Sequence, residues 1–163
     1  MSRKLCLSIA MVLPMATTAV AGVMQPGQWA IETTIEAAQG PGVPAQLPPQ
    51  PQRMQACKSQ AFVDRENYTS VTFAMQRLQR QQFTCKVDRQ EGDNRQAHWQ
   101  FSCERPDGVK VVNRAENQVS ADRLEQVATE TTTREGQPWS EVRVRVTGRL
   151  TGADCTAGDI QLK

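Results

Sequence analysis

Residues 84–104 read TCKVDRQEGDNRQAHWQFSCE, and this stretch decides the fold. Two segments of strand length flank Gly92-Asp93-Asn94, a sequence suited to a turn. Alternate side chains of a strand point to opposite faces of the sheet. One face of the second strand then carries Ala97, Trp99, Phe101 and Cys103, and the other carries Gln96, His98, Gln100 and Ser102. The stretch therefore predicts an antiparallel hairpin with one buried face.

The same hairpin brings two cysteines together. Folding the chain about Asn94 places Cys85 opposite Cys103, and directly opposed residues lie close enough for a disulfide. The four cysteines beyond the N-terminal segment allow three pairings, so this register also predicts, by elimination, a bridge between Cys57 and Cys155. A zinc site or a redox pair is the alternative, which the lack of any C-x-x-C and the single histidine disfavour.

Residues 1–21 have the order of a cleavable secretory signal. Arg3 and Lys4 precede a short apolar stretch, and Ala19-Val20-Ala21 offers small residues at the cleavage site. An uncleaved membrane anchor is the alternative, but the apolar run is shorter than the roughly 20 residues that span a bilayer. Cleavage would leave residues 22–163 as one periplasmic or secreted domain without a membrane span.

Cleavage also changes the charge of the chain. Arg3 and Lys4 are the only charged residues in the removed segment, so the positive balance of the whole chain, +2, disappears with them. A neutral mature domain has no overall positive field with which to attract nucleic acid. We therefore expect no nucleic-acid partner.

Further strands are predicted at 28–37, 53–57, 109–118, 123–133 and 139–150. In the last of them, the alternation sets Val142, Val144 and Val146 against Arg143, Arg145 and Arg149. Residues 40–52 are rich in proline, which cannot donate to a strand ladder, and are predicted to form an extended loop.

A turn at 136–138 sets the expected register of the last two strands. Counting back from it places Val127 on the same face as Val144 and brings Glu130 towards Arg143. The arginine row would then be an exposed face partly neutralised by acids across the strands. The alternative is a row of arginines that binds a ligand.

Residues 59–82 are predicted to be helical in part. Ser59 is suited to cap a turn over 60–66. A second amphipathic pattern is formed by Val71, Met75, Leu78 and Gln82. Arg77, Arg80 and Lys86 make a basic patch here. A solvated helix face is the plain interpretation, and binding of an anionic lipid or polysaccharide is the alternative.

About six or seven strands joined mostly by short turns predict a mainly β protein with an antiparallel meander. Such a sheet has an apolar face that must be covered. We expect a curved sheet or half-open barrel packed by the segment 59–82, with a β-sandwich as the alternative.

The sequence offers little catalytic chemistry. His98 is the only histidine, and the hairpin turns it away from Trp99 and Phe101. No G-x-S-x-G motif, phosphate-binding loop or dinucleotide fingerprint is present. We therefore expect a protein that is not an enzyme, with no catalytic residues, metal or cofactor. A hydrolase built on His98 or on a pair of carboxylates is the alternative.

Several segments together resemble a known family. They are MQPGQW at 24–29, RMQAC at 53–57, the Cys85–Cys103 hairpin and GRLTGADC at 148–155. With the Pro-rich loop, this pattern covers nearly all of 22–163 and resembles the exported Gram-negative family catalogued as domain of unknown function 3617. The resemblance implies an exported, disulfide-bonded β domain, and it brings no established activity.

These observations lead to two functional hypotheses. The first is a non-enzymatic module that binds a ligand or a partner protein of the cell envelope on its curved sheet. The second is a structural or interaction protein of the envelope that docks through its Pro-rich loop or an edge strand. The candidate surface residues are Arg143, Arg145, Arg149, Arg77 and Arg80.

Overall fold

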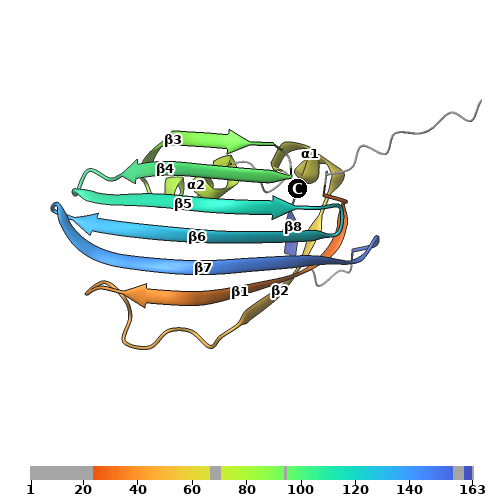
Figure 1. The fold of residues 1–163 in the computed structure, drawn as a ribbon, viewed down its shortest axis with the longest axis horizontal. Helices are drawn as coiled ribbons and strands as arrows, with labels where there is room; N and C mark the ends of the chain where they lie inside the picture. Colours follow the sequence, from red (N-terminus) through yellow and green to blue (C-terminus); the bar gives the residue numbers. More distant parts are fainter. Residues whose placement is uncertain (1–23, 67–70, 94, 156–159, 163) are drawn as a thin grey trace, which may run out of the picture.

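A computed structural model describes residues 24–66, 71–93, 95–155 and 160–162. They form one eight-stranded sheet with the order β3-β4-β5-β6-β7-β1-β2-β8, and two short helices lie on one face of it (Figure 1). The sheet is not closed, because β3 and β8 are its two edges. The predicted mainly β fold with a curved sheet and a helical segment within 59–82 is confirmed. The predicted signal segment 1–21 lies outside the described residues.

The elements run along the chain as β1 (Gly27–Gln39), β2 (Gln52–Lys58), α1 (Gln60–Glu66), α2 (Val71–Gln79), β3 (Thr84–Gly92), β4 (Gln96–Glu104), β5 (Val109–Val119), β6 (Arg123–Arg134), β7 (Gln137–Gly152) and β8 (Ile160–Leu162). The additional strand relative to the prediction is β8, which pairs parallel to β2. Helix α2 ends at Gln79, so Gln82, which was predicted to belong to the helix, lies beyond it.

The β3–β4 hairpin forms in the predicted register at its cysteine end, whereas a register shift between Val87 and Arg89 moves the pairing near the turn by one residue. Cys85 pairs with Cys103, their Cα atoms are 4.0 Å apart, and the disulfide between them is present. Gly92 enters the turn at a φ of 106°, a conformation that favours glycine. The Asp93 carboxylate then accepts hydrogen bonds from the backbone N–H groups of Arg95 and Gln96. The turn and the disulfide thus hold the hairpin at its two ends, and the register shift lies between them.

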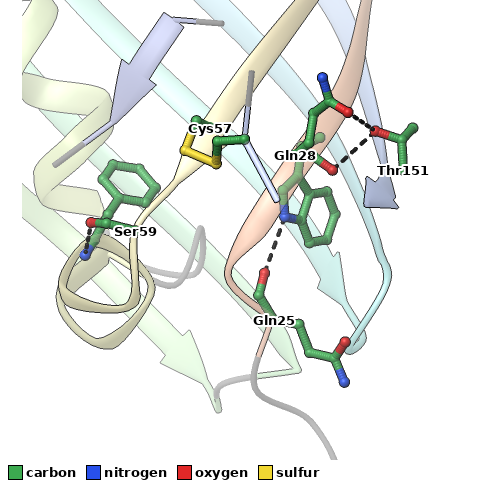
Figure 2. Close-up of a disulfide and its surroundings, with 8 residues drawn as sticks. Gln25, Gln28, Cys57, Ser59 and Thr151 are labelled. Carbon is green, nitrogen blue, oxygen red and sulfur yellow. Dashed lines mark hydrogen bonds between the residues drawn. A yellow bond between two sulfur atoms is a disulfide. The ribbon is translucent and has the colours of Figure 1, made fainter. Parts of the chain in front are cut away.

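The second predicted disulfide is also present (Figure 2). It joins Cys57 near the end of β2 to Cys155 beyond β7, with 5.4 Å between the Cα atoms. Two further contacts hold the same end of β1: the Trp29 indole N–H donates to the carbonyl of Gln25, and the Thr151 hydroxyl donates to that of Gln28. The start of β1, the end of β2 and the segment after β7 are therefore held together at one end of the sheet.

Ser59 caps helix α1 as predicted. Its hydroxyl oxygen accepts the backbone N–H of Phe62 at 3.1 Å, three residues on (Figure 2). The cap satisfies one of the N–H groups that the first turn of a helix leaves without a partner. The chain therefore turns directly from β2 into α1.

The register predicted for β6 and β7 was wrong beyond the turn. Glu135 and Gly136 both have positive φ, which suits a two-residue hairpin turn. A register shift then follows between Thr132 and Thr133, where β7 carries an extra residue. Such a bulge changes which residues of β6 and β7 share a face, compared with the pairing expected from counting back from the turn.

The bulge moves two residues to the faces opposite those predicted. Val127 pairs with Arg145 and lies on the outer face, the side away from the helices, whereas Val144 lies on the inner face. Glu130 pairs with Val142 and faces inwards, so it does not approach Arg143. The carboxylates that pair with the arginine row therefore belong to other residues.

The inner face is concave and carries two apolar clusters. The larger lies beneath α2 and includes Trp99, Phe101 and Leu78. The smaller lies beneath α1 and includes Trp29, Ile31 and Val63. The two helices thus cover the two ends of the face, as the need to bury an apolar sheet surface requires.

The Pro-rich loop between β1 and β2 is held at two points. The Gly42 N–H donates to the carbonyl of Trp139, and the Gln50 side-chain oxygen accepts the N–H of Ile35. Leu47 and Trp139 are among the large apolar residues that stay exposed here, at 42% and 37%. The loop therefore contacts the turn end of β7.

Candidate ligand-binding cavity

A cavity of about 480 Å³ lies on the concave face, beside α2. The main contacts of α2 are with β3 and β4, so the inner face of the strands beyond them is less covered. The cavity is lined by Thr33, Ala74, Arg77, Trp99, Asn113, Gln126, Ala128, Glu130, Val142, Val144 and Val146. These residues come from one helix and five neighbouring strands, so the fold itself creates the site.

One wall of the cavity is apolar. Val142, Val144 and Val146 alternate along β7 on its inner face, as the sequence predicted, and all three are half-buried. Val144 packs against the larger cluster and Val146 against the smaller. The valine wall therefore adjoins both clusters and leaves apolar surface exposed to the cavity.

The polar side of the cavity has three connected groups. The Arg77 guanidinium on α2 forms an ion pair with the Glu130 carboxylate on β6. The same carboxylate oxygen accepts a hydrogen bond from Asn113 Nδ2 on β5 at 3.2 Å. Helix and sheet are thereby connected across the cavity, and the Asn113 amide is held in a fixed orientation.

Asn113 keeps one polar atom without a partner. The residue is only 9% exposed, and its Oδ1 accepts no hydrogen bond from any of the described residues. A buried acceptor left in this state costs about 1–3 kcal/mol. This atom has almost no accessible surface, so an N–H or O–H group in the cavity can reach it only if the side chains around it shift. The cavity thus combines an apolar wall with a few converging polar groups.

The structure divides the predicted arginine surface between the two faces. Arg77 lines the concave cavity. On the outer face, Arg143 and Arg145 both bind the Glu36 carboxylate, at 2.9 and 2.6 Å, and these hydrogen bonds hold the pKa of Glu36 below its usual range. Arg149 lies six residues beyond Arg143, about 20 Å along the strand, and Arg80 is exposed after α2. The five arginines therefore do not form one surface.

The outer face has a shallow depression of about 610 Å³ around His98. Its polar lining includes Glu91, which pairs with His98 across the hairpin, and Arg114. As the hairpin predicted, His98 points away from the apolar cluster. Within the described ranges, no three His, Cys, Asp or Glu side chains are grouped as metal ligands, and no helix has the length and apolar character of a membrane span.

Sequence reasoning missed Asn113 and misplaced Glu130. The strand 109–118 looked irregular because Asn113 and Asn117 interrupt the apolar positions Val111, Ala115 and Val119, yet all five are buried on the same face. A polar residue at an inner position of an alternating strand was the available signal. Glu130 was misplaced because of the β7 bulge.

The comparisons with known proteins place the chain in a family. The search of curated proteins and the search of solved structures gave no match. The model of the DUF3617 family, described as a protein of unknown function, matches residues 24–155. That span contains both disulfides and every residue of the cavity. The chain belongs to the DUF3617 family.

Proposed function

We propose that this protein is a non-enzymatic binding module that takes an amphipathic small molecule into its concave cavity. The observation that carries this proposal is Asn113 Oδ1, a buried acceptor without a donor in a cavity that also has an apolar valine wall. The volume of about 480 Å³ lies within the usual range of small-molecule sites.

The polar groups indicate the chemistry of the ligand. The Glu130 carboxylate and Asn113 Oδ1 are both hydrogen-bond acceptors, and the Arg77 guanidinium is already paired with Glu130. A carboxylate at this end would face acceptors, whereas a hydroxyl or amide would supply the missing donor. The favoured ligand therefore has an apolar body, such as an acyl chain, with a neutral N–H or O–H donor.

The proposed place of action is the periplasm or the outside of the cell. Two disulfides are present, and disulfides persist mainly in oxidising compartments. The order of residues 1–21 supports the same location. Peptide mapping of the protein isolated from its host would test it: a mature chain beginning near residue 22 is expected, and an intact N-terminus in the cytosol would contradict it.

A fluorescence titration with 1-N-phenylnaphthylamine tests binding, since this probe combines apolar rings with one N–H donor. Dodecanol and dodecanamide are expected to displace the probe more strongly than dodecanoate. Asn113→Leu removes the acceptor, so it should reduce the preference for the two neutral competitors over dodecanoate about tenfold. An unchanged preference would contradict the assignment of Asn113.

A matched pair of variants locates the site. Val142→Trp places an indole in the cavity, whereas Val127→Trp places one on the outer face of the neighbouring strand. We expect the first to weaken probe binding at least about tenfold and the second to leave it unchanged, with circular dichroism as the test of folding. Equal affinities for the two folded variants, or no saturable binding by the wild type, would refute the proposal.

Docking of a partner protein at the Pro-rich loop is the second candidate function. The exposed Leu47 and Trp139 at this loop favour it. The β3 edge is less suited to strand addition, because charged side chains such as Lys86, Asp88 and Arg89 lie along it. Deletion of residues 40–51 is expected to abolish crosslinking to any such partner, and full retention of crosslinks would exclude the loop.

A further inference from the structure

A second depression, of about 720 Å³, lies at the opposite end of the outer face from the β6–β7 turn. Arg95, Arg123 and Arg149 line it, together with polar side chains that include Gln118, Ser120 and Thr147. Arg95 directly precedes β4, Arg123 begins β6, and Arg149 lies in the last third of β7. Three cations thus gather on the face opposite the concave cavity.

Two of these arginines face each other directly. Arg123 on β6 is the cross-strand partner of Arg149 on β7, and like charges in this position are unfavourable. Both side chains are exposed, and the ion pair of Arg123 is with its own neighbour Asp122, at 3.9 Å. No ion pair links Arg149 to a carboxylate of the described ranges. The charges of this pair are therefore poorly compensated.

Elsewhere on the outer face, the arginines of β7 have carboxylate partners. Arg143 and Arg145, on the same strand and face as Arg149, share the Glu36 carboxylate. Glu125 is the acid that lines the depression, and it is already bound by Arg145. The neutralisation of the arginine row thus stops before Arg149, which leaves an excess of positive charge at this end.

We propose that Arg123 and Arg149, with Arg95 beside them, bind a phosphate group. Opposed residues on neighbouring strands have Cβ atoms roughly 5 Å apart, so two guanidinium groups can converge on one anion. Each guanidinium offers a planar pair of donors that fits two oxygens. A phosphate monoester has three free oxygens and carries up to two negative charges, one more of each than a carboxylate, so it can balance both guanidinium charges. The hydroxyl of Ser120 or Thr147 can donate to a remaining oxygen.

NMR titration of the ¹⁵N-labelled protein tests the site, with the arginine Nε–Hε signals as the readout. Inorganic phosphate is added at constant ionic strength, and chloride serves as the control anion. Saturable shifts of the Arg123 and Arg149 signals are expected with phosphate only. Arg149→Gln and Arg123→Gln should each weaken binding about tenfold or more, and Arg143→Gln, on the same strand and face, should not.

A second measurement separates the possible sources of the phosphate. Vesicles of phosphatidylcholine with and without phosphatidic acid are compared in a sedimentation assay. Binding that requires phosphatidic acid and Arg149 indicates a lipid headgroup, whereas phosphate-dependent NMR shifts without vesicle binding indicate a soluble phosphate ester. Either result supports the site.

Three results would overturn the proposal: no saturable effect of phosphate in solution or on vesicles, equal binding by folded Arg149→Gln, or equal loss in Arg143→Gln. A thermal melt without phosphate provides an independent check. Arg149→Gln removes the like-charge pair, so its midpoint should not fall below that of the wild type. A loss of phosphate binding therefore cannot be attributed to unfolding.

Discussion

A lysine amine buried against an indole ring makes the stability of this fold depend on pH. Lys58 is 1% exposed, with its Nζ atom 3.1 Å from the sulfur of Met24 and 4.1 Å from the centroid of the Trp29 ring. Burial disfavours the charged form and lowers the pKa of Lys58 to about 6. The ordinary value in an unfolded chain is about 10.4.

The consequence is a stability that rises with pH between about 6 and 10. In this window the unfolded state binds the proton that the folded state lacks, so each rise in pH favours the folded state. Lys58→Met should raise the free energy of unfolding by one to a few kcal/mol at neutral pH, because one pKa unit corresponds to about 1.4 kcal/mol. It should also flatten the pH dependence, as measured by urea unfolding at several pH values.

Lys86→Met is the control for this experiment. The Lys86 side chain is 78% exposed and lies 3.7 Å from Asp88, so its replacement should change the free energy of unfolding by less than about 0.5 kcal/mol. If Lys58→Met kept the wild-type slope between pH 6 and 10, Lys58 would have to be charged in the folded protein.

At the scale of elements, the β3–β4 hairpin depends on its turn glycine. Gly92 has a φ of 106°, and a Cβ atom there would collide with the carbonyl oxygen of Gln96. Gly92→Ala should therefore lower the free energy of unfolding by more than the roughly 1 kcal/mol of an unfavourable backbone conformation alone. Thermal or urea unfolding measures the change.

Gly136 in the β6–β7 turn offers the comparison. Its φ of 78° is also positive, but a Cβ atom there would meet no heavy atom within 4 Å. Gly136→Ala should therefore show the backbone penalty without the collision, and a smaller loss of stability than Gly92→Ala. Equal losses would mean that the β3–β4 turn relaxes around the added methyl group.

The elements also show what the sequence could predict. Alternation and the Cys85–Cys103 spacing predicted the β3–β4 pairing at its cysteine end, because both depend on residues close in the chain, but not the register shift between Val87 and Arg89. The bulge before Ser140 left no such trace, so the prediction placed Glu130 on the wrong face. The inward Asn113 was hidden for a different reason: a polar side chain at a core position weakens the alternation by which a strand is recognised.

For the molecule as a whole, the pairing of β1 with both β7 and β2 connects the N-terminal strands to the meander. This pairing joins residues more than a hundred positions apart, such as Ile31 and Gly148. Local patterns carry no information about such partners, so the strand order could not be predicted. Only the Cys57–Cys155 bridge, inferred by elimination, indicated that the ends of the domain meet.

The two disulfides should contribute unequally to stability. The sequence separations are 98 residues for Cys57–Cys155 and 18 for Cys85–Cys103. On the chain-entropy model, these loops correspond to about 4–5 and about 3 kcal/mol. Urea unfolding of the two double Cys→Ala variants is expected to show the larger loss for the first pair. The reverse order would mean that the packing of the buried Cys103 outweighs loop entropy.

The Cys57–Cys155 bridge also decides how the domain transmits mechanical tension. A load applied at residues 24 and 162 passes through β1, β2 and the bridge, and it bypasses the sheet from β3 to β7. With the bridge intact, the chain can extend to only about 150 Å, compared with about 430 Å once this bridge alone is reduced, because the Cys85–Cys103 disulfide still closes its own loop. The covalent path of the load therefore bypasses β4 to β7, and only the pairing of β1 with β7 passes load on to these walls of the cavity.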